Sequence, residues 1–148
     1  KQPRNVSVRA IQCILLQSKA YIMPLFDVSP ADSEFEAIQR VTATGILKTT
    51  GQAYQWANRT WFYPDSTISV KEFTVGLNSF NKIVEPSSSN DLLSGAKAVE
   101  LLSKAAGTNL PADAVDSKPV TRRQLAQMID TLLKPFEKEI DFNGYYKK

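Results

Sequence analysis

Apolar residues recur at helical spacing along the chain, behind three similar short stretches. These stretches cover residues 6–11, 68–73 and 120–125, and each reads β-branched, hydroxyl, variable, basic, variable, apolar. Apolar positions three or four residues apart follow each stretch, which is typical of a helix with one buried face. Because one unit recurs, we expect an internally repeated, mainly helical protein in which similar helices surround one core.

A hydroxyl residue opens each of these helices. Ser69 with Glu72, and Thr121 with Gln124, have the spacing of a capping box, in which the hydroxyl accepts from a backbone N–H and the longer side chain reaches back. Ser7 lacks an acid or amide three residues later and keeps only the cap. Proline lacks a backbone N–H and disfavours the helical conformation of the residue before it. We therefore expect the three helices to end before Pro24, Pro86 and Pro135.

Two further helices are expected between these units. They stop at Gly45 and Gly107, because glycine favours the left-handed conformation that ends helices. The stretches 46–67 and 108–119 are loop-like, and the aromatic-rich part 52–63 either packs against the body or forms a short ribbon. Candidate caps are Asp32 or Ser33 for the first helix and Asn90 or Asp91 for the second.

Composition restricts the class of protein. The 148 residues are 43% hydrophobic and 22% charged, which fits one globular domain. The longest apolar stretch, 10–16, is far shorter than the roughly 20 residues that cross a bilayer, so we expect no membrane span. The net charge of +3 comes from 18 basic and 15 acidic residues, mostly scattered, so we expect no nucleic-acid partner. The chain begins at Lys1 without methionine, which indicates a fragment or processed form.

Catalytic chemistry has little support in these residues. The chain has no histidine, so the usual general base of serine and cysteine hydrolases and the usual zinc ligand are missing. Glu34 and Glu36 are two residues apart on an expected helix and point to different faces. Cys13 lies in an apolar pattern and is interpreted as a small buried hydrophobe. We therefore expect no catalytic residue, no metal and no cofactor within the chain, although its parent could be an enzyme.

The middle of the chain carries several short motifs in a fixed order. Leu25-Phe26-Asp27-Val28 comes first, Gly45-Ile46-Leu47 follows the next helix, and Phe62-Tyr63-Pro64-Asp65 precedes the helix start at 68–73. This order resembles the S-layer-homology repeat, whose pattern runs F-x-D-V, G-I-I, F-x-P-D and I-T-R-A-E-F. Phe35 stands where that family usually has tryptophan.

The resemblance predicts one domain built from unequal repeats. Residues 6–24 would be the closing helix of a partial repeat, 25–82 the best-matching repeat, 83–135 a degenerate repeat and 136–148 a tail. The fold that the resemblance implies is mainly α: a small helical bundle of helix-loop-helix repeats in a pseudo-threefold arrangement, with long aromatic-containing loops.

The same resemblance implies a ligand and basic residues that bind it. Members of the family hold cell-wall-linked polysaccharide with the arginine of T-R-A-E, and Arg122 matches that position. Lys71 and Arg9 are displaced by one residue, about 100° around the helix, and Arg123 follows Arg122. Independently of the family, a basic residue at a helix N-terminus favours an anion such as an acidic sugar substituent. Plain surface charge, or capping alone, is the competing interpretation.

Aromatic residues supply the remaining candidates. Stacking on sugar rings is a natural use for exposed aromatic faces, whereas burial of the loop against the core is the alternative. By analogy with the family Phe62 is buried, and of Trp56 and Trp61 one remains as a ligand platform. The aromatic residues fall within ten positions: Tyr54, Trp56, Trp61, Phe62 and Tyr63.

Two functions from different classes follow. The first is a non-catalytic module of a larger exported bacterial protein, which binds or anchors to carbohydrate of the cell envelope, periplasm or exterior. The second is a structural accessory domain that packs on a catalytic domain of the same polypeptide, such as an FAD-dependent oxidoreductase or a polysaccharide-degrading enzyme. A helix-turn-helix nucleic-acid binder is a weaker third, because positive charge is not concentrated on one helix.

Overall fold

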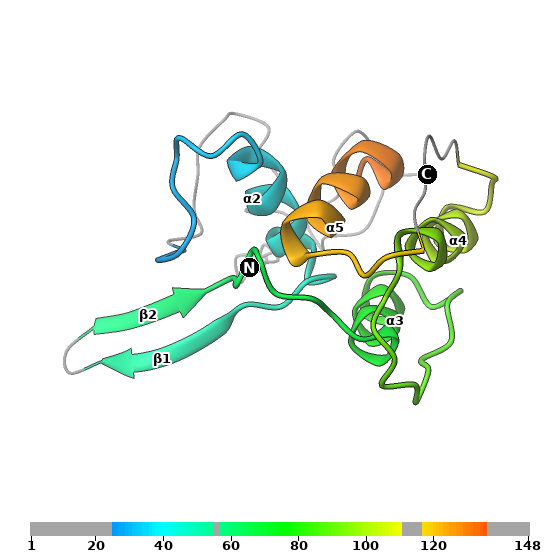
Figure 1. The fold of residues 1–148 in the computed structure, drawn as a ribbon, viewed down its shortest axis with the longest axis horizontal. Helices are drawn as coiled ribbons and strands as arrows, with labels where there is room; N and C mark the ends of the chain where they lie inside the picture. Colours follow the sequence, from blue (N-terminus) through cyan, green and yellow to red (C-terminus); the bar gives the residue numbers. More distant parts are fainter. Residues whose placement is uncertain (1–24, 55–56, 111–116, 136–148) are drawn as a thin grey trace, which may run out of the picture.

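The computed structural model describes residues 25–54, 57–110 and 117–135. This part is a small mixed α/β fold (Figure 1). The prediction of a mainly α helical bundle with long aromatic loops is therefore wrong, because the aromatic stretch forms a two-stranded antiparallel sheet. No helix of the described part is long and apolar enough to cross a membrane. In chain order the elements are α2 (Phe35–Thr44), β1 (Thr50–Tyr54), β2 (Ala57–Trp61), α3 (Val70–Phe80), α4 (Gly95–Ala106), α5 (Arg122–Met128) and a π-helical turn, η1 (Ile129–Leu133).

The hairpin β1–β2 extends away from the helices (Figure 1). Its strands pair from Thr50 opposite Trp61 to Tyr54 opposite Ala57, so of the two readings of the aromatic stretch the short ribbon is confirmed. Threonine and aromatic residues favour the extended backbone, which explains why this stretch pairs. The base is tied to the start of the described chain, because Phe26 N donates to the Thr60 carbonyl at 2.8 Å.

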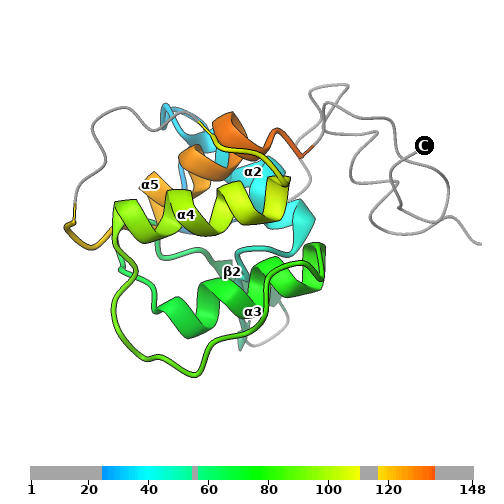
Figure 2. The same ribbon diagram turned by 90° about the vertical axis from the view of Figure 1, so that its right-hand side faces the viewer.

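Equivalent positions of α3, α4 and the α5–η1 helix contribute to the core, together with residues of α2. Figure 2 shows α3 and α4 side by side, with α5 and α2 behind α4. The fourth and eighth residues after each N-cap are all completely buried, as helical periodicity requires of one inward face. These residues are Phe73 and Leu77 in α3, Ala98 and Leu102 in α4, and Leu125 and Ile129 in α5 and η1.

Two of the expected helix starts are confirmed. The side chain of Ser69 accepts from Glu72 N, and Thr121 with Gln124 forms the full capping box. The expected cap of α4 at Asn90 or Asp91 is wrong, because Ser94 accepts from Lys97 N and the helix begins at Gly95. The first repeat of the pattern, 6–11, lies outside the described residues.

The three helix starts contact one another through short β-bridges. Thr67 pairs with Thr121, Ser69 with Leu92, and Ser94 with Pro119, so each start touches both of the others. The three caps share nearly the same extended backbone, with φ between −81° and −86°. The residue before each cap points into the core, and these residues are Ile68, Leu93 and Val120. The described part therefore contains a closed ring of three helix starts.

Helix α2 begins differently from α3, α4 and α5 but ends on a glycine, as α4 does. Its N-cap is Glu34 and makes no side-chain cap bond, so the expected caps Asp32 and Ser33 are wrong. The Asp32 carboxylate instead accepts from Ser29 N at 3.1 Å, inside the preceding turn. Gly45 ends the helix with a φ of 80°, as expected, and Gly107 ends α4 with a φ of 73°.

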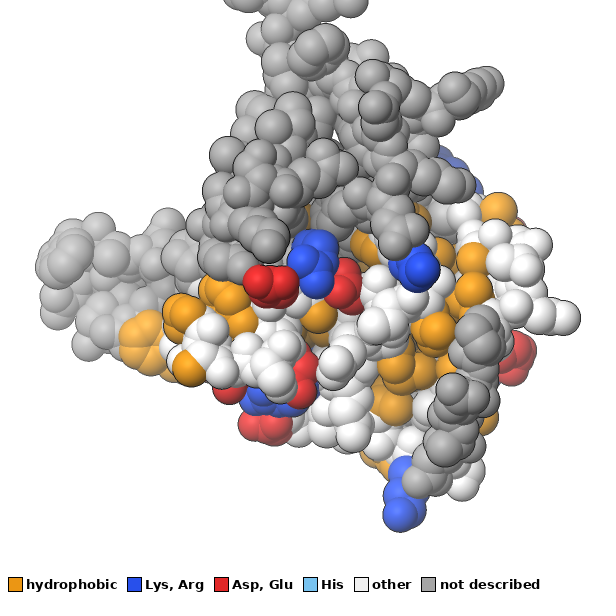
Figure 3. All heavy atoms as spheres, turned by 90° about the horizontal axis from the view of Figure 1, so that it is seen from above, with side chains coloured by type: hydrophobic (Ala, Val, Ile, Leu, Met, Phe, Trp, Pro, Cys, Tyr) orange, Lys and Arg blue, Asp and Glu red, His pale blue; other side chains and the backbone are white. Residues whose placement is uncertain are grey.

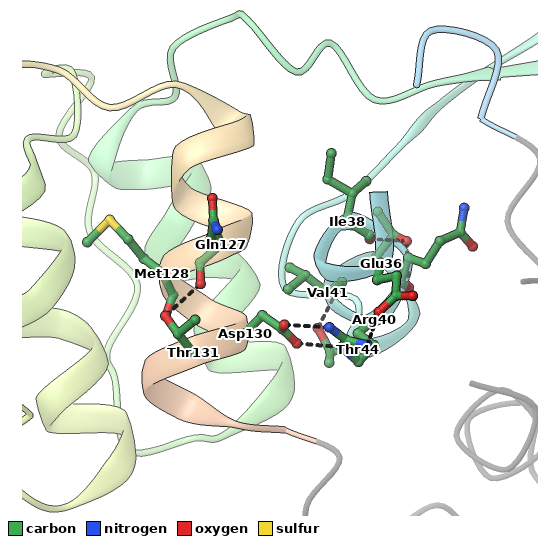
Figure 4. Close-up of polar contacts among 11 residues, drawn as sticks. Glu36, Ile38, Arg40, Val41, Thr44, Gln127, Met128, Asp130 and Thr131 are labelled. Carbon is green, nitrogen blue, oxygen red and sulfur yellow. Dashed lines mark hydrogen bonds and ion pairs between the residues drawn. The ribbon is translucent and has the colours of Figure 1, made fainter. Parts of the chain in front are cut away.

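A two-pronged ion pair joins α2 to η1 (Figure 4). Arg40 donates to the two carboxylate oxygens of Asp130 at 2.7 and 2.8 Å, and this bond raises the pKa of Arg40. The paired side chains are 32% and 15% exposed, so solvent screens the pair only in part.

We expect a double-mutant cycle of Arg40→Ala and Asp130→Ala to give a coupling free energy of about 1 kcal/mol, because the pair is bidentate and partly buried. Urea unfolding of the four proteins measures it. Lys97 and Glu100 form a more exposed pair within one helix and serve as the control, with a coupling below about 0.5 kcal/mol. Equal coupling in the two cycles would contradict the expectation.

Candidate functional site

Arg122, the best family match for a ligand-binding arginine, is buried, with 6% of its surface exposed. Its Nε donates to the Phe62 carbonyl at 2.7 Å, and Nη2 donates to the Lys48 carbonyl. Its Nη1 lies 3.4 Å from Oε1 of Glu72, and the guanidinium carbon lies 4.8 Å from the centre of the Phe62 ring. Burial lowers the pKa of Arg122 because it removes water from the charged form. The guanidinium therefore joins three segments of the chain itself.

Arg123, the next residue, lies among carboxylates. It donates to Glu34 at 3.1 Å and to Asp65 at 3.4 Å, and Asp32 lies 3.7 Å away. Burial lowers the pKa of Arg123, but the bond to Glu34 and the nearby carboxylates outweigh it and raise that pKa overall. Figure 3 likewise shows acidic and basic side chains next to one another on the face it presents. The surroundings of Arg123 thus repel rather than attract an anion.

The first N–H groups of α3 and α5 are already used inside the chain. In α3, Val70 N donates to the Asp91 carbonyl and Lys71 N to the Ser89 carbonyl, both at 2.9 Å. In α5, the backbone N–H groups of residues 122 and 123 donate to the carbonyls of residues 66 and 64. At both helices, therefore, these backbone N–H groups are not available to bind an anion. An anion at either helix start would have to be bound by side chains.

Lys71 faces an open groove of about 270 Å³ between α3 and the segment that follows α2. Lys71 and Lys48 are both exposed, and they lie on the helix side and the segment side of the groove respectively. The floor is apolar and the only carboxylate among the lining residues is that of Glu72, so cations outnumber anions. We call this the lysine groove, and its lining residues are Ile46, Leu47, Lys48, Ile68, Ser69, Lys71, Glu72, Val75 and Gly76.

Trp61 lies between two other aromatic rings at the base of the hairpin. Its ring centre is 4.7 Å from that of Phe26, with the planes inclined at 56°, and 6.2 Å from that of Tyr63, with the planes inclined at only 15°. Phe26 is 56% exposed and Tyr63 is 42% exposed. The Nε1 of Trp61 is covered and has no acceptor within the described residues. We call Phe26, Trp61 and Tyr63 the aromatic platform.

Asp27 fixes the position of this platform. Its two carboxylate oxygens accept from Phe62 N at 2.8 Å and from Tyr63 N at 2.7 Å. Tyr63 has a φ of 56°, a left-handed conformation that is unfavourable for a residue with a side chain, and the two bonds help to hold it there. Phe62 is completely buried, as expected by analogy.

The structure thus separates the residues that the sequence predicts. Lys71 lies in the lysine groove and Trp61 in the aromatic platform. Arg122 is buried and bonded to the carbonyls of Lys48 and Phe62. Arg9 and Trp56 lie outside the described residues. Sequence reasoning missed Lys48 as a neighbour of Lys71. The signal was available, because Lys48 directly follows the Gly45-Ile46-Leu47 motif.

The sequence places Tyr63 in the same aromatic stretch as Trp61, but sequence reasoning missed Phe26 as a partner. Phe26 occupies the variable position of its motif, so the motif itself does not draw attention to it. Within the described residues no group of three or more histidine, cysteine, aspartate or glutamate side chains could hold a metal ion. A comparison of the chain with protein-family models, with curated proteins and with solved structures finds no match.

Proposed function

We propose that the chain is a non-catalytic module of a larger exported bacterial protein, and that it binds an acidic glycan of the cell envelope in the lysine groove. The observation that carries the proposal is that exposed Lys48 and Lys71 line the same groove, whose other lining is mostly apolar. The apolar floor suits the C–H face of a sugar ring, and the ammonium groups suit a carboxylate substituent. The order of S-layer-homology-like motifs along 25–73 supports the same ligand class.

In this proposal Arg122 supports the groove from below instead of binding the glycan. Its bond to the Lys48 carbonyl holds the segment after α2, and its contact with Glu72 reaches α3 on the other side of the groove. Glu72 also lies close enough to the groove to disfavour a second negative charge on the ligand. The groove therefore suits a sugar with one acidic substituent better than a polyanion.

We expect Lys48→Ala and Lys71→Ala each to weaken binding of an acidic wall polysaccharide by about tenfold, because each removes one charge-assisted hydrogen bond. Isothermal titration with the purified polysaccharide measures the affinity. Lys97→Ala is the matched control: it removes a lysine at the third position of α4, outside the groove lining, and should leave the affinity unchanged. Absence of binding by the unsubstituted chain, or equal effects of all three substitutions, would overturn the proposal.

The second candidate, an accessory domain packed on another part of the same polypeptide, is favoured by exposed apolar side chains. Ile83 is 55% exposed and Leu92 is 54% exposed, on segments next to α3 and α4. Exposed apolar residues of this size are common at interfaces between domains. Reading the parent gene and measuring the exposure of Ile83 and Leu92 in the full-length protein by hydroxyl-radical footprinting would distinguish the two candidates: protection of both residues supports the accessory domain.

A further inference from the structure

We propose that the aromatic platform is a second binding site, distinct from the lysine groove, which stacks against the apolar face of an uncharged pyranose ring. The site consists of the rings of Phe26, Trp61 and Tyr63 with the carboxylate of Asp27 beside them. It does not depend on the lysine groove, because none of its residues lines that groove.

The geometry of the three rings is the first feature that favours a sugar site. Trp61 stacks with Tyr63, with ring centres 6.2 Å apart and planes inclined at 15°, and Phe26 is inclined to Trp61 by 56°. Trp61 is thus the centre of the cluster, and the two outer rings, Phe26 and Tyr63, present the exposed apolar surface on which a sugar ring can stack. Phe26 and Tyr63 are about half exposed, although water contact with apolar rings is unfavourable. A ligand that covers these rings recovers that free energy.

The second feature is that hydrogen bonds within the chain already hold the platform in place before any ligand binds. The Asp27 carboxylate holds the backbone N–H groups of Phe62 and Tyr63, and Phe26 N is bonded to the Thr60 carbonyl. Tyr63 keeps its left-handed backbone under these constraints. A fixed arrangement of rings loses little conformational entropy when a ligand binds.

The polar groups beside the rings decide which ligand fits. Each carboxylate oxygen of Asp27 uses one lone pair for a backbone N–H and retains another, which can accept from a sugar hydroxyl. A proline-rich peptide also stacks on aromatic rings, but it has few N–H donors to offer such an acceptor. Three rings are also far fewer than the roughly 20–30 residues a side of a stable protein interface. A neutral, hydroxyl-rich ring is therefore the favoured ligand.

Tryptophan fluorescence provides a direct test. The chain has two tryptophans, so Trp56→Phe leaves Trp61 as the only indole reporter. We expect neutral hexasaccharides of cellulose, chitin or mannan, titrated as separate probes, to change the emission of Trp61 with at least one of them saturating. In the same background, Phe26→Ala and Tyr63→Asn should weaken that binding by about tenfold each. Asparagine is chosen because it tolerates a positive φ.

Controls separate this site from the lysine groove and from misfolding. Lys48→Ala and Lys71→Ala should leave the response to neutral hexasaccharides unchanged, so each site can fail without the other. Circular dichroism should be the same for Phe26→Ala and Tyr63→Asn as for the parent, because both side chains are exposed. If no hexasaccharide affects Trp61, or if a decaproline peptide saturates the response while the sugars do not, the proposal is wrong.

Discussion

Gly76→Ala is expected to lower the free energy of unfolding by about 3 kcal/mol, because α3 packs directly against the backbone of the segment after α2. A Cβ at Gly76 would lie 2.0 Å from the carbonyl oxygen of Ile46 and 2.9 Å from its carbonyl carbon. Both atoms belong to the backbone and cannot rotate away, so the helix or the segment has to move. Urea unfolding followed by circular dichroism measures the loss.

Gly51→Ala provides the matched control for this substitution. A Cβ at Gly51 meets nothing within 4 Å, and Gly51 lies in β1. Its change in unfolding free energy should stay within about 0.5 kcal/mol. Because Ile46 and Gly76 both line the lysine groove, Gly76→Ala should also weaken acidic glycan binding, whereas Gly51→Ala should not. Similar stability of the two variants would show that α3 does not approach Ile46 so closely.

Arg122→Met should also lower the free energy of unfolding by about 3 kcal/mol, through lost hydrogen bonds rather than steric overlap. Methionine keeps most of the apolar volume but leaves the carbonyls of Lys48 and Phe62 without the donors that the guanidinium supplies. It also removes the cation from the face of the Phe62 ring. Urea unfolding measures the loss.

Two further variants identify the cause of this loss. Arg122→Lys keeps the charge but replaces the planar fork with a single ammonium, so we expect it to recover less than half of the lost stability. Arg123→Met removes a guanidinium that is 25% exposed and whose partners among the described residues are side-chain carboxylates, and its cost should stay below about 1 kcal/mol. Equal costs at residues 122 and 123 would show that Arg122 has no special structural role.

Local signals predicted helix ends better than helix beginnings. The glycine ends of α2 and α4 and the hydroxyl starts of α3 and α5 depend on bonds within a few residues, so the sequence alone indicates them. The start of α4 was misplaced because Asn90, Asp91 and Ser94 are all good caps. The bond from Leu93 N to the Ile68 carbonyl fixes an extended backbone at Leu93 and leaves Ser94 as the cap.

The candidate site was predictable in its residue types but not in its arrangement. The sequence places Trp61 in an aromatic stretch and Lys71 in a helix start, and that helix start is confirmed. Their partners Phe26 and Lys48 come from other segments, which only tertiary contacts bring near. The sequence left the aromatic stretch open between packing on the body and a short ribbon, because strand preference depends on packing partners more than helix preference does.

By itself, then, the sequence determined the helix starts at Ser69 and Thr121, the apolar inner faces that follow them and the glycine ends of α2 and α4, because these depend on neighbours three or four residues away. Only the tertiary structure decided that the starts of α3, α4 and α5 close into a ring and that Arg122 is buried. The bonds of Arg122 join residues 60 and 74 positions apart in the chain. A motif specifies which donor is present, but the acceptors and the water around it are set by how distant segments pack.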